Sequence, residues 1–88
     1  MNITVIHAEM NYTKEDGYVG KVQFNVEGHK NEYEMALQSK KGKDWGYGLF
    51  FLHESGNEEQ LNEVEDELEE NDEAFDRLVD AAMDALQK

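Results

Sequence analysis

The apolar side chains of the 88-residue chain repeat with two different periods, and the change falls near residue 56. Before it they recur at every second residue, the spacing of a strand with one buried face. After it they recur at steps of three and four, the spacing of an amphipathic helix. This order predicts a single domain over residues 1–88 of the α+β class. Residues 1–55 form an antiparallel sheet, and residues 56–88 form an acidic helix that covers one face of it.

The first part of the chain contains four predicted strands, at residues 3–12, 18–27, 32–38 and 45–53, separated by short polar turns. Short connections make neighbouring strands antiparallel, so we expect a four-stranded β-meander. Gly17 ends the first turn and is expected to adopt a positive φ. The residues predicted to face the core from the first three strands are Ile6, Ala8, Met10, Tyr12, Val22, Phe24, Val26, Tyr33, Met35 and Leu37.

The last third of the chain has the apolar stripe of a helix, which keeps its phase from Leu61 to Leu86. Ser55 and Asn57 are both suitable N-caps. The unbroken phase favours one long helix of about 30 residues, with a kink as a variant; at roughly 45 Å it would overhang strands of about 30 Å. The alternative is two helices, because Asn71 falls where the stripe needs an apolar residue and can cap a second helix.

The charge of the chain is concentrated in this predicted helix. The formal net charge is −13, and residues 57–88 hold 13 acidic and 2 basic residues, a net charge of −11. Such a protein is repelled by nucleic acids and by anionic lipid, so direct binding to either is not expected. The longest apolar run, residues 49–52, is too short to span a membrane, and residues 1–4 show no secretory signal. We therefore expect a cytoplasmic protein.

Seven carboxylates follow heptad-like steps of three and four along one edge of the predicted helix, and only Arg77 interrupts the row. We call them the carboxylate stripe: Glu59, Glu63, Asp66, Glu70, Glu73, Asp80 and Asp84. Many pairs of residues four positions apart in this region are both acidic, and only Glu73/Arg77 and Asp84/Lys88 are favourable pairs. The repulsion costs about 1–3 kcal/mol in total. Added salt and mild acid are therefore expected to stabilise the protein.

Two interpretations of the carboxylate stripe remain open. It is either a solvated helix face that keeps the protein in solution, or a surface that binds a basic partner. Its axial charge density is of the same order as that of one DNA strand. In charge profile the chain is similar to the small anti-restriction and anti-CRISPR inhibitors that mimic DNA. That similarity implies a non-enzymatic inhibitor that occludes a nucleic-acid-binding protein.

The segment from residue 45 to 52 is unusual because it carries large apolar groups on both faces of a strand. One interpretation places Phe50 and Leu52 in the core and Trp45, Tyr47 and Phe51 on the outer face, as a self-association patch. The alternative is core packing of the Trp45 row. The first interpretation supports a second function, that of a structural domain that forms a homodimer through its aromatic sheet.

No catalytic or metal-binding signature is present in the sequence. His7, His29 and His53 have no ligand spacing, there is no cysteine, and the acidic run lacks a calcium-loop pattern. Ser39 and Ser55 have no nearby histidine–acid pair. The sequence therefore predicts a protein that is not an enzyme and has no cofactor and no metal.

Overall fold

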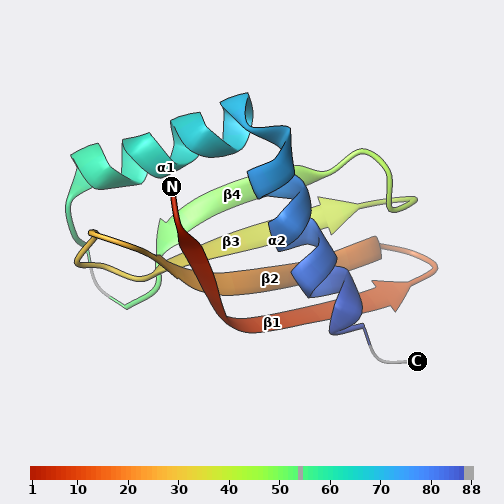
Figure 1. The fold of residues 1–88 in the computed structure, drawn as a ribbon. Coiled ribbons are helices and arrows are strands. Elements are labelled where there is room, and N and C mark those ends of the chain that lie inside the picture. The colour runs from red at the N-terminus through yellow and green to blue at the C-terminus, as the bar shows by residue number, and fades with distance from the viewer. Residues whose placement is uncertain (54, 87–88) are drawn as a thin grey trace.

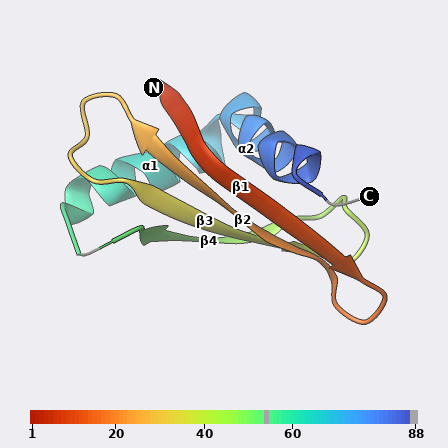
Figure 2. The ribbon, with the colours of Figure 1, turned by 90° about the horizontal axis from the view of Figure 1, so that it is seen from below.

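The protein is an antiparallel sheet with two helices on one of its faces (Figures 1 and 2), as seen in a computed structural model that describes residues 1–53 and 55–86. The predicted α+β class and the β-meander are confirmed, since the spatial order of the strands is β1-β2-β3-β4. The elements are β1 (Ile3–Thr13), β2 (Gly17–Val26), β3 (Tyr33–Ser39), β4 (Gly46–Phe51), α1 (Glu58–Glu70) and α2 (Asp72–Asp84).

Each connection between neighbouring strands contains a glycine with positive φ or ends at one. The values are 76° at Gly17, 88° at Gly28 and 79° at Gly42, a region in which a Cβ atom is strained. The expectation for Gly17 is confirmed. These tight turns fix the register that places Tyr33 opposite Phe24 and Phe51.

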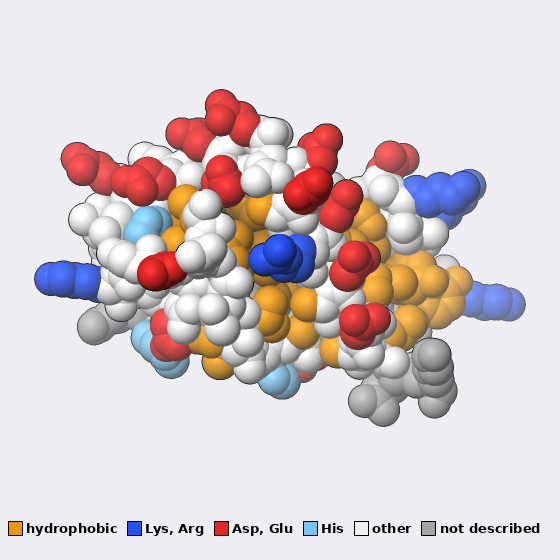
Figure 3. Space-filling view, in the orientation of Figure 1, with side chains coloured by type: hydrophobic (Ala, Val, Ile, Leu, Met, Phe, Trp, Pro, Cys, Tyr) orange, Lys and Arg blue, Asp and Glu red, His pale blue; other side chains and the backbone are white. Residues whose placement is uncertain are grey.

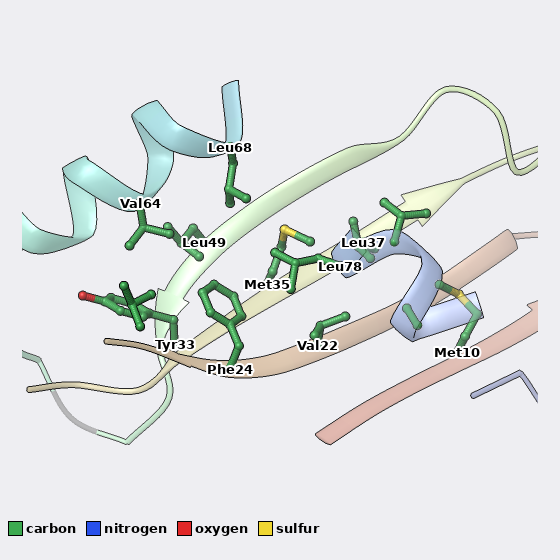
Figure 4. Close-up of a cluster of buried hydrophobic side chains, with 13 residues drawn as sticks. Met10, Val22, Phe24, Tyr33, Met35, Leu37, Leu49, Val64, Leu68 and Leu78 are labelled. Atoms are coloured by element: carbon green, nitrogen blue, oxygen red, sulfur yellow. The ribbon is translucent and has the colours of Figure 1, made fainter. Parts of the chain in front are cut away.

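The core lies between the sheet and the two helices (Figure 4). It confirms the predicted inward faces of the second and third strands, because Val22, Phe24, Tyr33 and Met35 have no exposed surface. The helices contribute the other side of the core. Their buried residues are Val64, Leu68, Leu78, Val79 and Ala82.

The first strand differs from its prediction at both ends. Met10 is buried and Ala8 packs against the core, but Ile6 is exposed because the register shifts between Val5 and His7. A β-bulge of this kind breaks the alternation on which the prediction depended. Tyr12 is exposed as well, at the end of the sheet near the first turn.

The C-terminal region is two helices, so the prediction of one long helix is wrong and its alternative is confirmed. Asn71 lies between the helices in an extended conformation, with φ −114° and ψ 95°. Its backbone N–H donates to the Glu67 carbonyl at 2.8 Å, and its side-chain oxygen accepts from the Ala74 N–H at 3.3 Å. One residue thus ends α1 and caps α2.

The break allows both helices to stay on the sheet. Each has 13 residues and is about 20 Å long, shorter than the longest strands. α1 packs against β4, whereas α2 crosses β2 and β1 (Figure 1). The N-cap of α1 is Asn57, whose side chain accepts from the Gln60 N–H at 3.1 Å. After α2, Leu86 forms a parallel bridge with Met10 of β1.

Candidate functional site

The carboxylate stripe lies on the solvent side of the helical layer. α1 carries Glu59, Glu63, Asp66 and Glu70, α2 carries the other three members, and all seven are exposed. In Figure 3 acidic side chains gather over both helices, basic side chains project at both ends of the molecule, and one basic side chain lies among the acidic ones. The excess of acidic groups over basic groups is therefore concentrated on the helical layer.

Few cationic groups lie near the helix carboxylates. Within the described residues, neither lysine nor arginine comes within 4.0 Å of a carboxylate of α1 or α2. The two groups that do are the Met1 amine, 3.9 Å from Glu67, and His29, 3.4 Å from Glu63. The predicted Glu73/Arg77 pair is not formed as an ion pair, and the Asp84/Lys88 pair involves a residue outside the described ranges.

The break at Asn71 changes the shape of the stripe. The sequence predicts one row along a single axis, but α1 and α2 point in different directions across the sheet (Figure 1). The predicted repulsion between Glu69 and Glu73 loses its basis, since these residues belong to different helices. The acidic groups therefore cover a broad, bent area above the sheet.

One contact that the sequence did not predict joins this acidic layer to the sheet. The His29 ring, 8% exposed at its side chain, lies in the turn between β2 and β3. Its Nδ1 is 2.8 Å from the Tyr33 hydroxyl, and its Nε2 is 3.4 Å from a Glu63 carboxylate oxygen. With the proton on Nε2, the hydroxyl of Tyr33 donates to Nδ1 and Nε2–H faces Glu63. His29 therefore links β3 to α1.

The Tyr33 hydroxyl is not prepared for nucleophilic chemistry. Burial, followed by the negative charge of Glu63, raises the pKa of Tyr33 above its ordinary value of 10.0. An activated nucleophile needs the opposite shift. The arrangement of Tyr33, His29 and Glu63 is therefore a structural link between sheet and helix.

The aromatic row of β4 faces the helices, so the prediction of an outer self-association patch at Trp45, Tyr47 and Phe51 is wrong in its placement. All three are partly buried and pack against the core, as the alternative interpretation expected. The reason is the β3–β4 register, which pairs Tyr47 with Leu37 and Phe51 with Tyr33 and so puts them on the buried face. Burial and the nearby carboxylates of Glu69 and Glu65 raise the pKa of Tyr47.

The outer face of the sheet carries the opposite set of β4 residues. Phe50 is 54% exposed there, and Val19 of β2 is 47% exposed. Between them is a shallow hollow of about 300 Å³ whose floor is formed by Ala36, Gly46 and Gly48. The expectation that Phe50 enters the core is wrong, because the β3–β4 register pairs Phe50 with Glu34 on the outer face.

No group of three or more His, Asp or Glu side chains in residues 1–53 and 55–86 is arranged to hold a metal ion. Neither helix of this part of the chain is long and apolar enough to cross a membrane. Comparison of the chain with protein-family models, with curated proteins and with solved structures found no match. The site is therefore defined by its own geometry, as an exposed acidic surface on an α+β fold.

Raising the salt concentration is expected to stabilise the protein. Exposed carboxylates four residues apart on α1 and α2 repel each other, and salt screens this repulsion. We expect the melting temperature to rise by several degrees, on the order of 5 °C, between low and high sodium chloride. Differential scanning calorimetry measures this rise.

The matched control for the salt experiment is the variant Glu59→Gln/Glu70→Gln. It removes two exposed charges of α1 with little change in shape, so its melting temperature should rise less steeply with salt than that of the wild type. Equal slopes would mean that sodium chloride acts by something other than screening of the carboxylate stripe.

Proposed function

We propose that the protein is a non-enzymatic binding module whose acidic helical layer occupies a basic protein surface, and that this surface otherwise holds nucleic acid. The protein then acts as an inhibitor by occlusion. The observation that carries the proposal is the exposure of the whole carboxylate stripe with no lysine or arginine within 4.0 Å among the described residues. Apart from Glu63, which lies 3.4 Å from His29, these solvated carboxylates have no cationic partner among the described residues and are free to meet cations of a partner.

The density of charge supports a basic partner of the nucleic-acid-binding kind. α1 holds eight acidic residues over about 20 Å of helix axis, or about one charge per 2.5 Å. This value lies between that of one DNA strand, about one charge per 3.4 Å, and that of the duplex, about one per 1.7 Å. The basic groups of a surface that binds phosphates would therefore meet negative charges at a comparable spacing along α1.

The cost of the like-charge pairs also favours binding over simple solvation. The pair Asp66/Glu70 on α1 and the pairs Asp76/Asp80 and Asp80/Asp84 on α2 are each destabilising by a few tenths of a kcal/mol. Solubility needs net charge but does not need these spacings. A basic partner removes the repulsion on binding, so the same residues that weaken the free domain strengthen the complex.

Charge reversal on α1 tests the proposal. The wild-type protein is immobilised, a nuclease-treated lysate of the source cells is passed over it, and retained proteins are eluted with steps of salt. We expect a basic protein to elute at intermediate salt, to be displaced by added duplex DNA or RNA, and to bind Glu59→Lys/Glu70→Lys at least about 100-fold more weakly. The isolated partner should also lose nucleic-acid binding when the protein is added.

The control variant is Glu15→Lys/Asp44→Lys, which changes the net charge by the same amount at exposed positions in two strand turns. It should retain the partner at nearly wild-type affinity, because the binding depends on the helical layer and not on total charge. The proposal fails if both double variants lose the partner equally, or if nucleic acid does not compete with the protein.

A further inference from the structure

The outer face of the sheet has a protrusion and a hollow side by side. Phe50 is one wall of the hollow and Val19 is the other. The ring of Phe50 lies over Gly48, since a Cβ atom built on Gly48 would be 3.0 Å from its Cε2 and Cζ atoms. At Gly46 the neighbour is the flexible side chain of Gln38, since a Cβ atom built there would lie 3.4 Å from its Nε2.

This face differs from the helical face in its charge. Its charged side chains near the hollow are Glu9, Lys21 and Glu34, and Lys21 lies 3.3 Å from Glu9 and 3.6 Å from Glu34. The pKa of Lys21 is raised above its ordinary value. The main cause is Glu9, through its hydrogen bond and its negative charge, and the charge of Glu34 adds to it. Glu9, Lys21 and Glu34, which we call the Glu9–Lys21–Glu34 row, therefore carry a net charge near −1. The net charge of residues 57–88, which form the helical side, is −11.

We propose that a second copy of this chain covers the outer face, in a two-fold dimer in which Phe50 of each copy enters the hollow between Val19 and Phe50 of the other. A two-fold contact needs a self-complementary patch, and a protrusion beside a hollow on the same strand provides one. The Glu9–Lys21–Glu34 row and the polar pocket lined by Asp16, Lys40 and Asp44 then lie at the rim.

The distribution of charge selects a second copy as the occupant. Two chains of charge −13 repel each other, and contact through the outer faces keeps their two acidic layers on opposite sides of the assembly. A basic partner would gain little from this near-neutral face.

The dimer concerns the face opposite the carboxylate stripe and does not depend on the proposed function. If both hold, the assembly presents two acidic layers that point away from each other, and each is free to bind a partner. A failure of the lysate experiment leaves the dimer prediction unchanged, and a monomeric protein leaves the acidic layer unchanged.

Sedimentation equilibrium of the purified chain over a wide concentration range tests the proposal. The wild type should reach a mass near twice the chain mass of 10.2 kDa. Phe50→Lys, which buries a charge at the interface, and Gly46→Val, which fills the hollow, should each weaken the dimer at least about tenfold. Circular dichroism should show both variants folded, because neither position contributes to the core.

Tyr12→Lys is the matched control, because Tyr12 is an aromatic residue with 52% exposure that does not line the hollow and lies beside Met10 and Leu86 instead. It should dimerise like the wild type. The wild-type dimer should also tighten as salt is added, since screening reduces repulsion between two acidic chains. A wild type that stays monomeric, a dimer insensitive to Phe50→Lys and Gly46→Val, or a dimer that salt dissociates by breaking lysine–carboxylate contacts would each overturn the proposal.

Discussion

Gly20→Ala is expected to destabilise the protein by about 3 kcal/mol, although it adds one methyl group to a strand. A Cβ atom at position 20 would collide with the Glu9 carbonyl oxygen and would lie 2.9 Å from both the Cα and the Sδ atoms of Met10. The carbonyl oxygen and Cα belong to the backbone of β1, so a side-chain rotation cannot relieve the contact. We expect the melting temperature to fall by on the order of 15 °C.

The control for this prediction is the same substitution at Gly46. Both glycines lie in strands and neither has a positive φ, but Gly46→Ala meets only the flexible Gln38 side chain at 3.4 Å. It should be neutral or stabilising by up to about 0.5 kcal/mol, because alanine restricts the unfolded chain. Thermal denaturation of the two variants side by side separates close backbone approach from the general cost of replacing glycine. Equal melting temperatures would contradict the tight β1–β2 packing.

The need for glycine at position 20 shows where sequence patterns reach their limit in this sheet. Alternation predicted the inward faces of β2 and β3, since the buried residues follow a period of two within each strand: Val22, Phe24 and Val26 in β2, and Tyr33, Met35 and Leu37 in β3. It could not predict the bulge near Ile6, because an inserted residue leaves no mark in the order of apolar side chains. Nor could it predict which strand backbones approach each other closely.

The orientation of β4 was ambiguous because both of its faces are apolar, but the sequence contained a usable signal. The predicted inward face of β3 holds Met35 and Leu37, and antiparallel partners across a hairpin point to the same side of the sheet. The length of the turn between the strands sets those partners as Leu49 and Tyr47. Counting register across the turn, rather than counting apolar residues within the strand, would have assigned Phe50 to the outer face.

The helices show a different limit. The apolar phase continues through Asn71, so periodicity alone favoured one helix. Two local facts opposed it, namely the polar side chain at a core-facing position and a predicted length greater than that of the strands. In the structure Asn71 ends α1 and caps α2, so that α1 packs against β4 and α2 against β1 and β2. The exposed positions of the stripe were predictable, whereas its bent course was not.

The link between the acidic layer and the sheet was outside the reach of sequence patterns altogether. The fold of the whole chain brings together His29, Tyr33 and Glu63. His29 and Tyr33 are only four residues apart in the sequence, but Glu63 is distant from both. The consequence for function is that one member of the carboxylate stripe is held by the sheet. The other six have no such partner among the described residues, so they are free to move with a bound surface.

Tyr33 is the residue whose loss is expected to have the largest effect on stability. It has no exposed surface, and its ring lies 5.7 Å from that of Phe24 and 5.9 Å from that of Phe51, between centroids. Tyr33→Ala should lower the free energy of unfolding by about 4 kcal/mol, since it removes a buried aromatic ring and leaves a cavity. Chemical denaturation at neutral pH measures this loss.

Tyr33→Phe separates the hydroxyl from the ring. It keeps the packing but leaves Nδ1 of the buried His29 without its partner, at an expected cost of about 1.5 kcal/mol. Tyr12→Phe removes the hydroxyl of an exposed tyrosine that makes no hydrogen bond to residues 1–53 or 55–86, and it should change nothing measurable. If the two phenylalanine variants are equally stable, the contact between Tyr33 and His29 does not contribute to folding.

Alkaline pH gives a second readout of the same hydroxyl. Burial raises the pKa of Tyr33 in the folded protein above 10.0, the ordinary value that applies to the unfolded chain. The stabilisation linked to this proton is therefore fully present below pH 10 and is lost as the pH rises through the folded pKa, because the unfolded state ionises first.

The unfolding free energy of the wild type and of Tyr12→Phe should fall steeply above pH 10. That of Tyr33→Phe should fall less, with Tyr47 and Lys21, whose pKa values are also raised, accounting for the remaining slope. Identical alkaline profiles for wild type and Tyr33→Phe would show that the phenol of Tyr33 titrates as it does in the unfolded chain.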